Sequence, residues 1–292
     1  MTFPKIDLDY LNARLGELLN LPSPTGYTDE AVWALCRELE RLGLDYELTR
    51  RGAIRVRLPG LEAVPARAIV AHVDTLGAQV KAVKDNGRLE LVPIGHWSSR
   101  FAEGARCTVF AEGGGYRGTI LPLKASGHAF NEEVDDQPVN WRQVELRIDA
   151  VIHGRADTLA LGVDVGDIVA IDAQPEFTDS GFIVSRHLDD KAGVAVMLAA
   201  LECMLREERT PRVDTWWLFT IAEEASRSPF RATSRPVEAE AARPIGPRTQ
   251  FQSNRTRNRR KAATRAKVIP AAMNSGRPGR RTASHTGSRA TT

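Results

Sequence analysis

Two long apolar runs constrain the fold of this chain more than any other feature. One is Ala66–Val73 (ARAIVAHV) and the other is Thr215–Ile221 (TWWLFTI). The first run has no polar alternation, which is typical of a strand buried on both faces of an α/β sheet. The second run also predicts a strand. We therefore expect an α/β domain whose central sheet is flanked by helices.

Three helical patterns accompany these strands. Leucines recur at helical spacing from Leu8 to Leu19, and the stretch Pro22–Gly26 ends that pattern. A second amphipathic helix is predicted from Val32 to Leu42, with Gly43 as its C-terminal stop. The Ala-, Val- and Leu-rich segment Asp189–Arg206 predicts a third helix.

Between these elements, residues 77–177 have a different sequence pattern. Glycine recurs, and short β-favouring pieces separate the glycines, which indicates a small inserted β-rich domain. The predicted division is residues 1–76 for the first part of the catalytic α/β domain, 77–177 for the insertion, and 178–224 for a truncated second part of the catalytic domain.

The last 68 residues differ from the rest in charge and hydrophobicity. Residues 225–292 contain 16 basic and 2 acidic residues and no Leu, Trp or Tyr, whereas residues 1–224 contain 24 basic and 35 acidic residues. Such a segment cannot bury enough apolar surface to offset its ordering entropy. We predict a disordered basic tail, which could in principle bind nucleic acid.

Three widely spaced cysteines argue against a disulfide scaffold and favour a reducing compartment. The N-terminus shows no signal-peptide pattern, and no apolar stretch approaches the roughly 20 residues of a membrane span. We therefore expect a cytoplasmic protein without membrane association.

His72 and Asp74 follow the first apolar run. A neutral imidazole is a good metal ligand when its second nitrogen is held by an acceptor, and an Asp two residues on could supply that acceptor. The simpler interpretation is a core histidine followed by an aspartate that caps the next turn.

Two acidic pairs also lie at the ends of core elements. Asp189 and Asp190 open the third helix, where capping explains one aspartate better than two. Glu223 and Glu224 follow the second apolar run, at the strand end where open α/β sheets place their sites. One Glu can bind a metal while the other acts as a general base, although a solvated strand end is the plainer alternative.

Together these motifs resemble the dinuclear-zinc aminopeptidases of the tetrahedral (TET) or glutamyl aminopeptidase type, and within them the branch associated with the osmoprotectant N-acetylglutaminylglutamine amide system. The resemblance covers residues ~6–224. It is carried by the segments Ser23–Gly26, Ala71–Gly77, Asp179–Gly181, His187–Gly193 and Phe219–Glu224.

The resemblance implies a role for each site residue. His72, Asp189 and Glu224 would bind two divalent metal ions, with Asp189 bridging; the metal would be zinc, with cobalt or manganese as alternatives. The catalytic residues would be Glu223, the general base that deprotonates the attacking water, and Asp74, which orients His72. The protein would remove N-terminal residues from peptides. Its insertion would serve dimerisation, within a homo-oligomer that is a dodecamer of dimers.

The chain departs from the family pattern after Glu224. The pattern requires a further Asp and a further His as ligands, but no Asp follows Asp214, and His285 stands in a Thr/Ser/Arg-rich context. Each metal ion would then keep two protein ligands, fewer than the three of a catalytic zinc site. We therefore expect this particular chain to be inactive.

Two hypotheses account for the tail. The sudden loss of leucine and the Arg/Ala/Pro/Thr/Ser bias favour an out-of-frame reading of a GC-rich gene. The alternative is a catalytically dead interaction protein whose basic tail binds nucleic acid, but the tail has few aromatic residues and no nucleic-acid motif. Nucleic acid is therefore not the expected partner.

Overall fold

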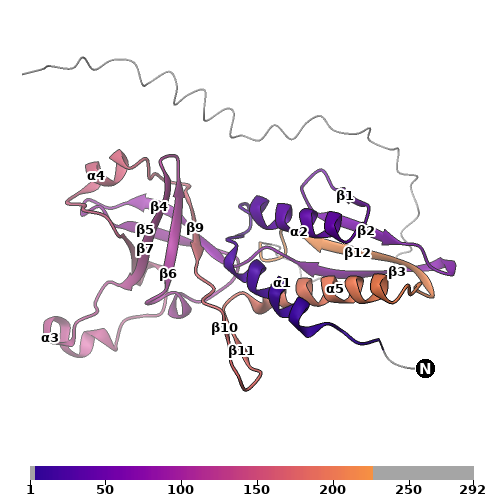
Figure 1. Ribbon diagram of the computed structural model, residues 1–292. Coiled ribbons are helices and arrows are strands. Elements are labelled where there is room, and N and C mark those ends of the chain that lie inside the picture. The colour runs from indigo at the N-terminus through magenta and orange to yellow at the C-terminus, as the bar shows by residue number, and fades with distance from the viewer. Residues whose placement is uncertain (1–3, 226–292) are drawn as a thin grey trace, which may run out of the picture. The chain divides into compact units, whose positions relative to one another are not determined.

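The computed structural model describes residues 4–225, which lie within one compact unit. They form a helix-covered sheet and a closed β-barrel (Figure 1). The mixed α/β architecture with helices against the sheet confirms the predicted fold class. The tail predicted from residue 225 lies outside the described residues, apart from its first residue.

The sheet has four strands in the order β1-β2-β12-β3. They are β1 (Tyr46–Leu48), β2 (Ile54–Leu58), β12 (Val213–Thr220) and β3 (Glu62–His72). Strand β12 pairs antiparallel with β2 and parallel with β3, so that Thr220 lies beside His72. Because β3 and β12 are parallel, the residues that follow them emerge at the same edge of the sheet.

Three helices share one hydrophobic core with the sheet: α1 (Leu8–Asn20), α2 (Asp29–Arg41) and α5 (Leu188–Arg206). Their buried side chains pack with Val56 of β2 and with Trp217 and Phe219 of β12. Helix α2 ends just before Gly43, whose φ of +71° is the left-handed conformation that glycine adopts at such a stop. The three predicted helices are confirmed.

Strand β3 differs from its prediction. We expected the run Ala66–Val73 to be buried on both faces, but most of β3 is exposed and only its end, from Ala71 onward, is buried. Val70 is 42% exposed. Within residues 4–225, β3 is an edge strand with β12 as its one neighbour in the sheet, and this explains the exposure.

The segment from Gly77 to Ile171 forms the barrel, with strands in the order β4-β5-β8-β7-β6-β9. Its strands are β4 (Gly77–Val83), β5 (Leu89–Ile94), β6 (Arg106–Ala111), β7 (Gly114–Pro122), β8 (Val144–Ile148) and β9 (Ile168–Ile171). The barrel has its own apolar core, which includes Leu89, Cys107 and Leu146. A short hairpin, β10 (Glu176–Phe177) and β11 (Ile183–Val184), leads back from the barrel to α5.

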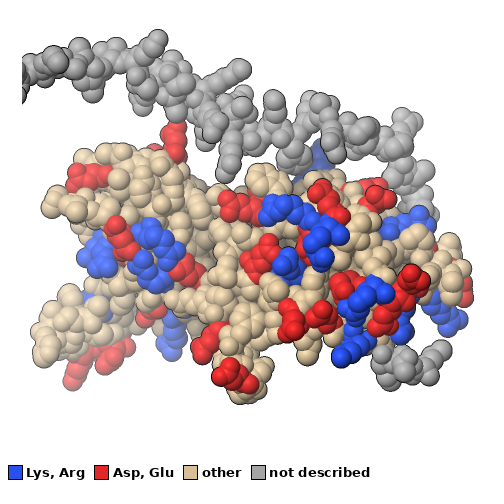
Figure 2. All heavy atoms as spheres, viewed as in Figure 1, with Lys and Arg blue, Asp and Glu red and all other residues tan. Residues whose placement is uncertain are grey.

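Short helical segments join the barrel strands: η1 (Ser99–Phe101), α3 (Gly127–Phe130), η2 (Asn131–Val134), η3 (Trp141–Gln143) and α4 (Arg155–Ala160). On the face shown in Figure 2, basic and acidic side chains are interspersed. Many form surface ion pairs, such as Arg206 with Glu202. In the described part of the chain, no helix is both long and apolar enough to cross a membrane.

Candidate active site

His72 is the last residue of β3, and its ring is held at both nitrogens. The side chain is 9% exposed. Its Nδ1 lies 3.0 Å from the backbone oxygen of Asp74 and 3.4 Å from the Asp74 carboxylate. Its Nε2 faces two other carboxylates, at 3.1 Å from Asp189 and 3.7 Å from Glu223. The structure therefore brings together strand ends and a helix start that lie more than 100 residues apart in the sequence.

Asp74 is fully buried and connects the other site residues. Its Oδ1 accepts a hydrogen bond from the backbone N–H of Glu223 at 3.1 Å, and its Oδ2 accepts one from Glu224 at 3.2 Å. The Thr25 hydroxyl donates to Oδ2 at 2.6 Å. One carboxylate thus fixes the backbone of both glutamates beside the His72 ring.

The two aspartates of α5 have different environments. The Asp189 side chain is 91% exposed and reaches toward His72 Nε2. Asp190 turns the other way, and its carboxylate accepts hydrogen bonds from the backbone N–H groups of His72 (3.2 Å) and Gly193 (3.1 Å). Both aspartates have non-helical backbone angles, and the peptide bond between them is cis. One aspartate therefore caps the helix and the other faces the site.

Charge in the site shifts the pKa of three groups. Burial would lower the pKa of His72, but hydrogen bonds and attraction from Asp74, with a contribution from Asp189, raise it to about 9. Burial would raise the pKa of Asp74, but hydrogen bonds from His72, Thr25 and the two glutamate N–H groups lower it. For Glu224, burial raises the pKa to about 7; His72 opposes this, and the charges of Asp189 and Glu223 add to it.

The donor chemistry of this cluster fits a divalent cation. An imidazole whose second nitrogen is fixed by an aspartate, facing several carboxylates, is a common metal-ligand arrangement. In the described residues, no Lys or Arg forms an ion pair with Asp189, Glu223 or Glu224. However, no three His, Cys, Asp or Glu side chains between residues 4 and 225 are placed to hold one ion. The cluster is therefore an incomplete ligand set of the right chemistry.

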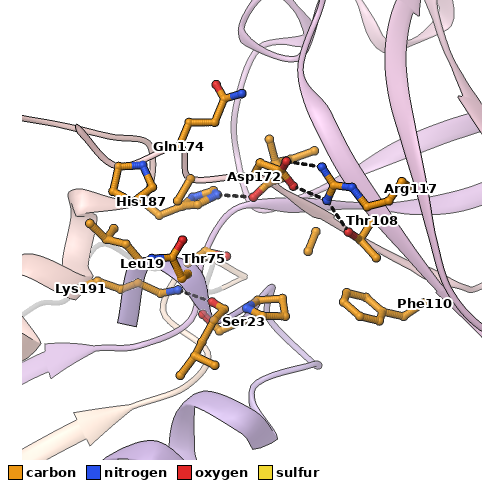
Figure 3. A pocket seen from close by; sticks show the side chains of 17 residues that line it. Leu19, Ser23, Thr75, Thr108, Phe110, Arg117, Asp172, Gln174, His187 and Lys191 are labelled. Atoms are coloured by element: carbon orange, nitrogen blue, oxygen red, sulfur yellow. Dashed lines mark hydrogen bonds and ion pairs between the residues drawn. The ribbon is translucent and has the colours of Figure 1, made fainter. Parts of the chain in front are cut away.

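Two cavities lie near these residues. One, of about 870 Å³, borders the site and is lined by Glu224, by Thr25 and Gly26, and by barrel residues that include Gln79 and His96. The other, of about 340 Å³, is shown in Figure 3 and contains none of the predicted site residues. In it, Lys191 approaches from α5 and His187 from the position just before α5, while Arg117, paired with Asp172, approaches from the barrel.

Sequence reasoning missed two residues that support the site. Lys191 is fully buried, and its ammonium group donates to the backbone oxygens of Leu18 (2.7 Å) and Leu21 (2.6 Å) at the end of α1. Burial lowers the pKa of Lys191 to about 7. Thr25 binds Asp74, and its only sequence signal was its place in the segment Ser23–Gly26.

A helix-covered sheet that gathers an imidazole and several carboxylates at adjoining strand ends has the architecture of a metallohydrolase. The model of the M42 glutamyl aminopeptidase family matches residues 52–241. The chain belongs to this family, which confirms the family resemblance drawn from the motifs.

Individual proteins are also similar to this chain. The chain is 38% identical over 209 residues to a Bacillus subtilis (strain 168) protein that carries the name aminopeptidase YhfE, covering 71% of this chain and 60% of the relative. It superposes with a TM-score of 0.66 on a TET aminopeptidase from the marine sediment archaeon Thaumarchaeota archaeon SCGC AB-539-E09, at 22% identity, covering 75% of this chain and 60% of that chain.

A third relative is the Pyrococcus horikoshii TET1 peptidase, described as able to assemble into a tetrahedron or a large octahedral shell. Its TM-score is 0.63 at 22% identity, with 74% of this chain and 62% of that chain covered. At these identities the two solved structures show a shared fold. The chain spans about 60% of the length of the first curated relative.

Proposed function

We propose that the site is that of an aminopeptidase that uses two divalent metal ions, with zinc as the first candidate. His72, Asp189 and Glu224 would hold the metal. The buried Asp74 carboxylate carries this proposal, because it fixes His72 and the backbone of both glutamates in one arrangement. A divalent ion supplies a Lewis acid and lowers the pKa of a water molecule.

The residues of this chain have separate roles in the reaction. Glu223 is the general base: its carboxylate accepts a proton from the attacking water and then gives that proton to the leaving amine. Asp74 does not touch the substrate, and it acts as a positioning residue for His72.

We further propose that this chain by itself does not complete a turnover. The motivation is the incomplete ligand set in residues 4–225, together with the lack of any Asp after Asp214. Elemental analysis would give the zinc content of the purified protein, and release of p-nitroaniline from aminoacyl-p-nitroanilides would give its activity. Two zinc ions per chain together with turnover would refute the inactivity proposal.

The metal-binding roles are tested separately from activity. His72→Ala and Asp189→Asn should each lower Zn²⁺ affinity at least about a hundredfold in calorimetric titration, since each changes a ligand and even the loss of a ligand's hydrogen-bond partner typically costs ten- to a hundredfold. Glu202→Gln, which changes a surface ion pair on the same helix, is the matched control and should leave affinity unchanged. Equal Zn²⁺ affinities in the original chain and the three variants would refute the proposed metal site.

The finer assignments rest on resemblance. The assemblies described for TET1 support a homo-oligomer, which the mass of the protein by light scattering tests. Its formation through the inserted domain 77–177 is proposed from the family resemblance. A peptide substrate, the osmoprotectant branch and a cytoplasmic location are proposals of the same kind. Hydrolysis of a panel of dipeptides and dipeptide amides would separate the branch from general peptidases.

A further inference from the structure

Thr25 lies in a turn that is fastened to the candidate site along its length. The turn follows α1, and Thr75 donates its backbone N–H to Ser23 at 2.8 Å, while Thr25 donates its own to Thr75 at 3.3 Å. The Ser23 hydroxyl donates to the Val73 oxygen at 2.7 Å. The turn therefore runs beside residues 73–75 and cannot shift without breaking several hydrogen bonds.

The barrel side of the same turn is fixed by an aromatic contact. The ring of Tyr27 stacks on Phe110 of β6, with ring centroids 4.3 Å apart and an interplanar angle of 20°. A stacked pair of this kind contributes roughly 0.5–1.5 kcal/mol beyond its buried area. Thr25 thus stands between two anchored segments, and its hydroxyl has a defined direction.

That hydroxyl points at the one carboxylate on which the site depends. Thr25 Oγ1 donates to Asp74 Oδ2 at 2.6 Å, the shortest of the contacts that hold this buried group. Without it, the Asp74 carboxylate keeps only the two N–H donors of Glu223 and Glu224 and the His72 ring. The carboxylate could then rotate toward the His72 ring and release the two N–H groups, or rotate toward the N–H groups and release the ring.

We infer that Thr25 is a positioning residue that sets the metal affinity of the candidate site through the Asp74 carboxylate. The inference rests on the proposed function in one respect, since it takes His72 to be a metal ligand. It assigns a role to a hydroxyl group that itself contacts neither metal nor substrate. The hydrogen-bond partners of a ligating imidazole typically govern metal affinity by ten- to a hundredfold, and Thr25 acts through one such partner, Asp74.

Two substitutions separate the hydroxyl from the bulk of the side chain. Thr25→Val keeps the shape and removes the donor, whereas Thr25→Ser keeps the donor and removes a methyl group. Thr220→Val is the matched control, because Thr220 lies beside His72 in the sheet but its hydroxyl contacts Ala71 at 3.4 Å and not Asp74. Far-UV circular dichroism and urea midpoints of the metal-free proteins establish that all variants fold.

Calorimetric titration with Zn²⁺ is the first measurement. We expect Thr25→Val to bind about five- to tenfold more weakly than the original chain, because one hydrogen bond to the partner of His72 is lost, and Thr25→Ser and Thr220→Val to bind within about twofold of it. Thr25→Val binding as tightly as the original chain would overturn the inference. An equal loss in Thr25→Val and Thr25→Ser would also overturn it, because the hydroxyl would then not be the cause.

Hydrogen exchange gives a second readout that needs no metal. The N–H groups of Glu223 and Glu224 donate to the same carboxylate, so loosening it should speed their exchange about fivefold to tenfold in Thr25→Val. If the original chain bound no Zn²⁺, the proposed function would fail, and the exchange rates would still decide the role of Thr25. Unchanged rates in Thr25→Val would overturn that role.

Discussion

The carboxylate of Asp190 accepts a hydrogen bond from the backbone N–H of His72 at 3.2 Å and so ties the end of β3 to the start of α5. The same carboxylate caps the helix through Gly193. A residue adjacent to a proposed metal ligand thus has a structural task, and the acidic pair of the sequence divides into one residue for the fold and one for the site.

Because the two aspartates have different tasks, two similar substitutions should lower the free energy of unfolding by different amounts. Asp190→Asn replaces an acceptor of two N–H bonds by an amide and should lower the free energy of unfolding by about 1–2 kcal/mol. Asp189→Asn changes an exposed side chain and should cost less than about 0.5 kcal/mol in metal-free protein. Urea denaturation measures both, and equal losses would show that the two residues are not divided in this way.

A second prediction concerns the carboxylate that joins α1 to α2. Glu38 is buried and accepts hydrogen bonds from Tyr10 (2.6 Å), Arg14 (3.0 Å) and Arg41 (2.6 Å). Glu38→Gln should lower the free energy of unfolding by about 1.5–3 kcal/mol, because Arg41 loses this partner and Arg14 keeps only Glu17. Glu17→Gln removes the partly exposed ion pair of Arg14 and is the control, with an expected loss below about 0.5 kcal/mol.

A third prediction tests the barrel through two glycines of nearly equal φ. Gly87 (φ +79°) is closely surrounded, and an added Cβ would lie 2.2 Å from Ile152, whereas Gly104 (φ +75°) has open space. Gly104→Ala should cost about 1 kcal/mol for its backbone conformation alone. Gly87→Ala should cost at least about 2 kcal/mol more, since the backbone must also shift. Thermal unfolding of both variants checks the difference.

A fourth prediction is a pH dependence within the barrel. Burial would raise the pKa of Glu145, but hydrogen bonds from Lys84 and Arg88 lower it. A carboxylate with a lowered folded-state pKa stabilises the protein above its unfolded-state pKa of about 4.3, and this contribution is lost as the pH falls through the folded-state value.

The free energy of unfolding should therefore differ between the original chain and Glu145→Gln by about 1–2 kcal/mol at pH 7. The difference should shrink as the pH falls from about 5 toward 3. Guanidinium denaturation across this range measures it, and a difference that stayed constant with pH would argue against the ion pairs of Glu145 as its source.

Local patterns in the sequence were sufficient to predict several helices and strands and the family. Helical spacing of leucines located α1, the stop at Gly43 located the end of α2, and the run TWWLFTI located β12. Each of these patterns involves residues that are close in the sequence, so it can be recognised without knowledge of the tertiary structure.

The contacts of the site could not be obtained in this way. Nothing local in the sequence shows that Thr25 would reach Asp74, or that Lys191 would bind the end of α1, because both contacts cross between segments far apart in the chain. The exposure of β3 was missed for a related reason. An apolar run predicts a buried strand, but its burial depends on neighbours that the run itself does not specify.

The open edge of β3 has a consequence for the behaviour of the protein in solution. Within the part of the chain that the structure describes, β3 (Glu62–His72) has no second neighbour, so its alternate backbone donors and acceptors face away from β12. Such an edge is a template for pairing with another chain. Pro65 interrupts the row of donors at one point only. Self-association through this edge would be driven by backbone hydrogen bonds. Added salt should therefore change the degree of self-association little. A substitution that blocks the edge would keep the protein monodisperse, whereas a change of surface charge would not.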